Sequence, residues 1–178
     1  NGSRTRFLAV RFGNVIGSSG SAIPIFQKQI AQEGPVTITH PDMQRYFMSI
    51  PEAAQLILQV GAMGQGGEVF ILDMGQPVRI LDMAKELIRL HGLEPDKDIE
   101  IKFVGLRPGE KLYEELITKG EGIIETSHEK IVVLRGCGGD SDCLKTQVDE
   151  LLALAVNCDA HLIKDKLKEI VPEYNPQP

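Results

Sequence analysis

The chain has 178 residues, of which 42% are hydrophobic and 25% are charged, and its formal net charge is −6. This length is enough for one domain with a real core, or for one domain with an appended helical piece. Lys and Arg form no continuous stripe along the sequence, so we expect no nucleic-acid partner. No apolar run approaches the roughly 18–20 residues that cross a bilayer, so we expect no membrane contact.

The start of the chain and its cysteines bear on the cellular compartment. Asn1 is not an initiator Met and no secretory signal follows it, so we expect a piece of a longer, cytoplasmic protein. The three cysteines, Cys137, Cys143 and Cys158, fit free thiols in a reducing compartment. The spacing of the first two is wrong for a zinc knuckle and no His is adjacent, so we expect no metal site.

The first third of the chain alternates strand-like and helix-like segments. Residues 5–12 form a short apolar run of strand length, and a loop rich in Gly and Ser follows over 13–21. The apolar spacing over 22–33 predicts a helix that closes at Gly34 and Pro35. Residues 36–39 then predict a short strand.

The same alternation continues through the middle of the chain. Ser49 and Glu52 have the spacing of a capping box, which predicts a helix over 50–63. Residues 68–73 are strand-like, and 80–91 predict an amphipathic helix that ends at a glycine. Strands that alternate with helices in this way are typical of an α/β layered core.

The last segments are more varied. Residues 99–104 alternate like a strand, 107–110 form a loop, 111–117 predict a helix, and 131–134 predict another strand. A linker rich in Gly, Asp and Ser leads to two amphipathic helices over 144–156 and 160–170. The expected domains are 1–135 for the α/β part, 136–142 for the linker, 143–172 for the helical hairpin and 173–178 for the tail.

Two patterns narrow the chemistry. Gly61, Gly64 and Gly67 mimic a phosphate-binding glycine motif, but they follow a helix and precede a strand, so we interpret them as a helix end and a turn. The Tyr-x-x-x-Lys pair of short-chain dehydrogenases is absent, because no Tyr of the chain has a Lys four residues later. We therefore expect no catalytic residue in this chain.

Four polar residues in loops and at strand ends are candidates for ligand binding. Arg45 and Arg107 could each bind a phosphate through two N–H groups, and Glu110 could accept from ribose hydroxyls. Asn14 follows a strand, where its amide could read a carbonyl or a phosphate. On the pattern alone, surface salt bridges for the arginines and an ordinary turn for Asn14 remain the alternatives.

Four segments together resemble one family. They read RFGNVIGSSGS over 11–21, PVTIT over 35–39, DMQRYFMSI over 42–50 and GLRPGEKLYEE over 105–115. In this order and at this spacing they resemble the C-terminal half of extended short-chain dehydrogenases that act on nucleotide sugars. Among these they are most similar to bacterial UDP-N-acetylglucosamine 4,6-dehydratases and related epimerases of capsule and O-antigen biosynthesis. The resemblance covers about residues 5–135.

The resemblance implies a role for each matched residue. Phe12, Gly13 and Val15 match the segment against the nicotinamide, and Asn14 matches a contact to the nucleotide sugar. Gly20, Ser21 and Ala22 match a loop over the sugar nucleotide, and Val36, Thr37 and Ile38 match a strand whose backbone reads the uracil. Arg45 and Arg107 match the two diphosphate ligands, and Glu110 matches the ribose ligand.

The resemblance also implies an activity and a fold. In the family, bound NAD or NADP oxidises C4 of the sugar, water is lost across C5 and C6, and the hydride returns. Epimerase relatives return the hydride to the opposite face of C4. The expected fold is the end of a Rossmann-like sheet with a small substrate-binding domain, plus a C-terminal helical hairpin.

Three interpretations follow for the chain itself. It is an inactive part of a UDP-sugar dehydratase or epimerase, a natural nucleotide-sugar-binding module, or a structural piece whose C-terminal helices dock a partner. Whole relatives sometimes carry membrane anchors, so the parent protein is also a candidate for attachment at the inner membrane. The first strand would keep an open edge, which predicts a homo-oligomer.

Overall fold

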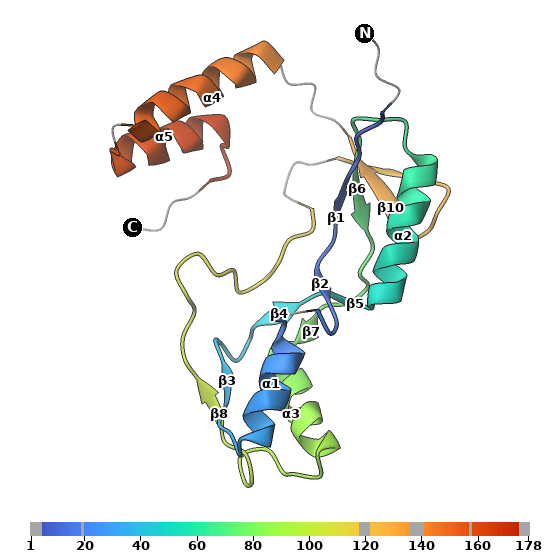
Figure 1. Ribbon diagram of the computed structural model, residues 1–178, viewed down its shortest axis with the longest axis vertical. Helices are drawn as coiled ribbons and strands as arrows, with labels where there is room; N and C mark the ends of the chain where they lie inside the picture. The colour runs from blue at the N-terminus through green and yellow to red at the C-terminus, as the bar shows by residue number, and fades with distance from the viewer. Residues whose placement is uncertain (1–4, 19, 118–121, 136–140, 157, 175–178) are drawn as a thin grey trace. The chain divides into compact units, whose positions relative to one another are not determined.

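The computed structural model describes residues 5–18, 20–117, 122–135, 141–156 and 158–174. The chain divides into two compact units, Asn1–Gly136 and Cys137–Pro178. The first unit contains strands and three helices, and the second contains two helices (Figure 1).

A four-stranded sheet forms one half of the first unit. Its order is β1 (Ala9–Arg11), β6 (Val69–Leu72), β10 (Ile131–Leu134) and β9 (Ile123–Glu125). Strands β1 and β6 are parallel, whereas β10 runs antiparallel to both β6 and β9. Among the described residues no strand pairs with the second edge of β1, as the sequence predicts. The oligomeric state that this open edge suggests stays a prediction.

Helix α2 (Ile50–Met63) directly precedes β6 in the chain and packs on this sheet (Figure 1). The hydroxyl of Ser49 accepts a hydrogen bond from the N–H of Glu52 at 3.3 Å, which confirms the expected cap. The Glu52 carboxylate pairs with Lys130 at 2.6 Å instead of bonding back to Ser49, so only half of the capping box forms. Apolar side chains of α2, of the sheet and of neighbouring segments form one buried cluster: Met48, Ala53, Leu56, Val60, Phe70, Leu72, Met74 and Ile131.

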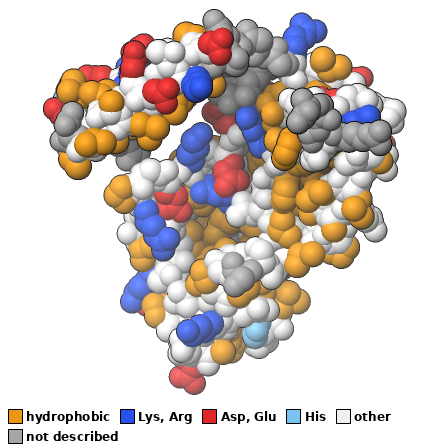
Figure 2. Space-filling model, turned by 45° about the horizontal axis from the view of Figure 1, so that its top comes forward, with side chains coloured by type: hydrophobic (Ala, Val, Ile, Leu, Met, Phe, Trp, Pro, Cys, Tyr) orange, Lys and Arg blue, Asp and Glu red, His pale blue; other side chains and the backbone are white. Residues whose placement is uncertain are grey.

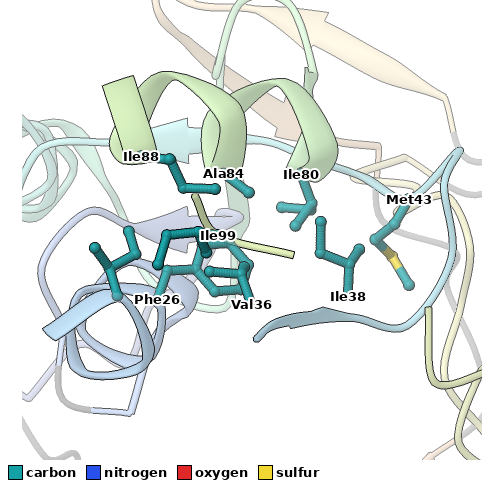
Figure 3. Close-up of a cluster of buried hydrophobic side chains, with 9 residues drawn as sticks. Phe26, Val36, Ile38, Met43, Ile80, Ala84, Ile88 and Ile99 are labelled. Carbon is teal, nitrogen blue, oxygen red and sulfur yellow. The ribbon is translucent and has the colours of Figure 1, made fainter. Parts of the chain in front are cut away.

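A second buried cluster forms the other half of this unit. Strands β3 (Val36–Ile38) and β8 (Ile101–Phe103) pair in parallel, and helices α1 (Ala22–Ala31) and α3 (Ile80–Leu90) pack against them. Figure 3 shows the side chains of these elements pointing toward one another. The cluster consists of Phe26, Ile30, Val36, Ile38, Met43, Ile80, Ala84, Ile88 and Ile99.

Short ladders join the segments between the two clusters. Strand β2 (Asn14–Val15) pairs in parallel with β5 (Phe47–Met48), and β4 (Gln44–Arg45) pairs antiparallel with β7 (Val78–Arg79). Each of these strands has two residues, so sequence patterns could not identify them. The β2–β5 ladder places the segment 11–21 beside the segment 42–50.

The second unit is a helical hairpin of α4 (Ser141–Val156) and α5 (Ala160–Ile170). The Asp159 carboxylate caps α5 by accepting from the N–H groups of His161 and Leu162. Helix α4 begins within the segment expected as a linker; residues 136–140 of that segment lie outside the described residues.

One expected helix is wrong. Residues 111–117 form no helix, and the carbonyls of Lys111 and Leu112 accept instead from the Arg45 guanidinium. The Leu112 carbonyl also accepts from the backbone N–H of Gln44 at 3.3 Å. Tertiary hydrogen bonds thus occupy the acceptors that a helix would need, and they override the local propensity. The other expected helices are confirmed to within two residues at each end, apart from the start of α4.

Replacing Ile88 with Ala should lower the free energy of unfolding of the first unit by about 2–4 kcal/mol, because its side chain is fully buried and a cavity would remain. Leu90 lies two residues away on the same helix and is 81% exposed, so Leu90→Ala should change it by less than about 0.5 kcal/mol. Urea titration, monitored by hydrogen exchange of the α3 amides, measures the free energy of unfolding of both variants. Equal effects of the two variants would contradict the assigned core.

Candidate functional site

A cavity of about 260 Å³ lies beside the second buried cluster. Its walls come from β2, Gly20 before α1, α1, β3, the β4–β5 segment, the start of α3 and the segment after β8. Eight of the ten residues expected to bind substrate line it: Asn14, Gly20, Ala22, Thr37, Ile38, Arg45, Arg107 and Glu110. The fold therefore brings residues that lie up to 96 positions apart, since 110 − 14 = 96, to one place.

Arg107 and Glu110 form a turn at the mouth of this cavity. The Glu110 N–H donates to the Arg107 carbonyl at 3.0 Å, and the Arg107 N–H donates to the Glu110 carboxylate at 3.1 Å. The Thr39 hydroxyl donates to the other carboxylate oxygen at 3.3 Å. The Arg107 side chain is exposed and forms no ion pair with any described residue, so its guanidinium can take an anion.

Arg45 is held much more tightly than Arg107. Its guanidinium donates to the carbonyls of Gln44, Lys111 and Leu112 at 2.7–3.2 Å. Its Nε also pairs with the Glu114 carboxylate at 3.1 Å, and its side chain is only 13% exposed. Arg45 thus joins β4 to the segment after β8 while it lines the cavity.

The β2–β5 ladder positions Asn14. Its backbone N–H donates to the Tyr46 carbonyl at 2.9 Å, next to Gly13. A Cβ on Gly13 would lie 3.0 Å from Tyr46 Cβ and 3.2 Å from Tyr46 O, so any larger residue would crowd this close approach. Asn14 also lines a second cavity of about 430 Å³, together with Phe12 and Gly13. The two cavities therefore share a wall.

Part of β3, the strand expected to bind the uracil base, belongs to the buried core. Val36 and Ile38 are buried, and the Val36 N–H donates to the Glu100 carbonyl of the neighbouring segment at 2.9 Å. The Thr37 N–H faces the other way and donates to the Gln29 side chain at 3.1 Å. The Gln29 amide in turn donates to the Thr37 hydroxyl at 2.7 Å. Thr37 and Ile38 line the cavity, whereas Val36 lies behind them.

The start of α1 and the glycine before it also contribute to the wall, through Gly20 and Ala22. Ser21 between them does not line the cavity. It is the N-cap residue, but its hydroxyl makes no capping hydrogen bond. Among the described residues, the Ser21 Oγ is the one buried side-chain N or O atom without a partner. Val15, expected near the cofactor, packs against the sheet cluster instead of lining either cavity.

Sequence reasoning missed an apolar part of the wall. It consists of Ile25, Phe26, Met43, Phe47 and Ile80, with Thr39 beside them. These side chains occupy positions that read as ordinary core in helices and strands, so no sequence signal separates them from the rest of the core. Together they make the cavity amphipathic, because its lining also includes the charged residues Arg45, Arg107 and Glu110.

The charges around the site are mixed rather than uniform. On the face that Figure 2 shows, Lys and Arg side chains lie beside Asp and Glu side chains. Away from this cavity, the Glu52 carboxylate raises the pKa of Lys130 by accepting its hydrogen bond, and this pair joins α2 to the start of β10.

No group of three or more possible metal ligands occurs among the described residues. Within those residues, no helix is both long and apolar enough to span a membrane.

Gly13→Ala should destabilise the first unit by about 1–3 kcal/mol, because the added methyl meets backbone and Cβ atoms that a ladder holds in place. Gly61→Ala is the matched control: it lies within α2 with no atom near its Cβ position, and it should stabilise by about 0.5–1 kcal/mol. Urea midpoints of the two variants should therefore move in opposite directions. A Gly13→Ala midpoint equal to that of the unchanged protein would contradict the close approach.

Comparisons with known proteins agree with the motifs. The family model described as "Polysaccharide biosynthesis protein" matches residues 1–136. The chain is 54% identical over 168 residues to the capsular polysaccharide biosynthesis protein CapD of Staphylococcus aureus, covering 94% of this chain and 27% of CapD. It is 36% identical over 118 residues to a UDP-glucose 4-epimerase of Rickettsia bellii, covering 66% of this chain and 33% of that protein.

A solved structure shows the same fold. The X-ray structure of Pen from Bacillus thuringiensis matches with a TM-score of 0.68 and 36% identity, over 76% of this chain and 42% of that chain. The chain thus spans about a quarter to a third of the length of these curated relatives. Its α/β architecture is part of the Rossmann-like short-chain dehydrogenase fold. The chain belongs to the polysaccharide biosynthesis protein family, among the extended short-chain dehydrogenases related to nucleotide-sugar dehydratases and epimerases.

Proposed function

We propose that this chain is the nucleotide-sugar-binding part of an NAD(P)-dependent 4,6-dehydratase or epimerase of bacterial surface-polysaccharide biosynthesis. The substrate would be a UDP-sugar of the UDP-N-acetylglucosamine type. The observation that carries the proposal is the convergence of eight expected substrate residues, from five separate segments, on one amphipathic cavity. Residues scattered for other reasons would not share a single cavity.

The chemistry of the walls suits a nucleoside diphosphate. The apolar side chains, including Phe26 and Phe47, can cover the faces of a pyrimidine base. The Glu110 carboxylate can accept from ribose hydroxyls, and the Arg107 guanidinium can bind the diphosphate through parallel N–H groups. The two charged residues of the segment after β8 thus each have a counterpart in the ligand.

The dimensions suggest where the sugar would go. A cavity of about 260 Å³ is smaller than typical sites for drug-sized ligands, so it would hold the nucleoside part. Asn14 lines both this cavity and the larger one beside Phe12 and Gly13. The sugar would therefore extend past Asn14 toward the segment expected to face the nicotinamide.

The cofactor would meet only a small part of this chain. Phe12 and Gly13 line the larger cavity, so the nicotinamide ring would lie against this segment. NAD or NADP, when bound, would supply reversible hydride removal from C4 of the sugar. This chain's own residues would bind and orient the sugar nucleotide for that step.

The proposal leaves the acid–base step to another part of the parent enzyme. None of the three tyrosines, Tyr46, Tyr113 and Tyr174, is followed four residues later by a Lys. The chain spans 27% of the length of CapD, so the catalytic pair and the cofactor phosphate loop would belong to residues outside it. Accordingly, we expect the chain to bind a nucleotide sugar but to turn over none.

Calorimetric titration with UDP, UDP-N-acetylglucosamine and UDP-glucose tests the proposal. Arg107→Ala should weaken UDP binding by about tenfold to a hundredfold, because a charge-assisted hydrogen bond contributes about 1.5–3 kcal/mol. Arg89→Ala is the matched control, since Arg89 is an exposed arginine that pairs with Glu86 on α3, outside the cavity lining. It should leave binding unchanged.

The outcomes separate the site from the family assignment. Equal weakening by Arg107→Ala and Arg89→Ala would indicate non-specific attraction of the anion and would contradict the assigned site. Failure of the unchanged chain to bind any of the three ligands would contradict a preformed site in this chain. Tighter binding of UDP-N-acetylglucosamine than of UDP would support a sugar contact at Asn14.

A further inference from the structure

Arg45 and Glu114 form an ion pair that the expected binding roles leave unexplained. Nε of Arg45 lies 3.1 Å from the Glu114 carboxylate, whose side chain is 33% exposed. The Arg45 side chain itself is 13% exposed and lines the candidate nucleotide cavity. A shielded cation with a single carboxylate partner therefore stands at the place where the proposed function needs a phosphate ligand.

The remaining donors of this guanidinium are almost all engaged. Nη1 donates to the carbonyls of Gln44 and Leu112, and Nη2 donates to the carbonyl of Lys111. A guanidinium has five N–H donors, so with Glu114 on Nε these contacts leave one N–H of Nη2. The group is planar and rigid, so partners on three nitrogens fix both its plane and the direction of that remaining N–H.

We propose that Glu114 is a positioning residue, which orients the Arg45 guanidinium so that its remaining N–H is presented to a phosphate in the cavity. This inference rests on the proposed function, since it assigns the phosphate to that same site. Glu114 lines the larger neighbouring cavity rather than the nucleotide cavity, so its carboxylate would act on the phosphates through Arg45.

Charge gives the pair a second role before the ligand binds. Removing one partner of a shielded ion pair leaves an uncompensated charge, which is strongly unfavourable. Glu114 therefore balances the charge of the Arg45 guanidinium and holds it in place in the unliganded site. The opposite possibility is competition, in which the carboxylate occupies Arg45 and a phosphate must displace it. The two possibilities predict opposite changes in UDP affinity for Glu114→Gln: positioning predicts weaker binding, and competition predicts tighter binding.

The experiment compares UDP with uridine, because only UDP carries the phosphates. Glu114→Gln should weaken UDP binding about five- to fiftyfold while leaving uridine binding unchanged. Glu86→Gln is the matched control: Glu86 also pairs with an arginine, Arg89, but this pair lies on α3 and Glu86 lines neither cavity. It should change neither ligand. Calorimetry or NMR titration of the 178-residue chain measures both affinities.

A ligand-free measurement accompanies the titrations. The Arg45 Nε–H, observed by ¹⁵N NMR, should exchange with water several-fold faster in Glu114→Gln and at the original rate in Glu86→Gln. An unchanged exchange rate in Glu114→Gln would overturn the orienting contact whatever the ligand data show.

The titrations add two further outcomes that overturn the inference. Tighter UDP binding by Glu114→Gln would establish competition instead of positioning. Equal loss of uridine and UDP would mean that Glu114 supports the whole 105–117 segment and has no specific action on the phosphate. In contrast, an unchanged chain that binds neither UDP nor uridine would overturn the proposed function, and with it the phosphate role of Arg45.

Discussion

The parallel pairing of β2 with β5 is the constraint on which the candidate site depends. Strand β2 follows β1 after two residues, and β5 ends just before α2. The Ile16 N–H extends the pairing by donating to the Met48 carbonyl at 2.8 Å. The sheet cluster and the second cluster each form a separate apolar core. This short ladder fixes the segment between the cores, so the loop at 13–21 meets β3 and the segment after β8 around one cavity.

The parts of the fold that could be predicted are those with a long apolar period. Helices α2, α3 and α5 agree closely with the sequence expectation because each buries or aligns one face over at least three turns. The two-residue strands could not be predicted, since their existence depends on partners far away in the chain. Residues 111–117 show the same limit in reverse. Their helical pattern is real, but the Arg45 guanidinium competes for the carbonyls.

The candidate site was predictable where a motif required a particular chemistry. Arg107 and Glu110 stand out as a charged pair beside Pro and Gly, and Asn14 stands out at a strand end. The apolar wall was not predictable, because Phe26 and Met43 belong to the buried cluster and also face the cavity. The Arg45–Glu114 contact was equally hidden, since its partners are 69 residues apart, as 114 − 45 = 69.

The hairpin of α4 and α5 differs energetically from the rest of the chain. None of its described side chains is buried, and helices of 16 and 11 residues are marginal without tertiary packing. The salt link between Lys166 and Glu150 at 2.5 Å is exposed on the carboxylate side and adds little. The two units should therefore lose structure over different temperature ranges. A single melting temperature would not describe this chain, and the helical signal of α4 and α5 would fade before the first unit unfolds.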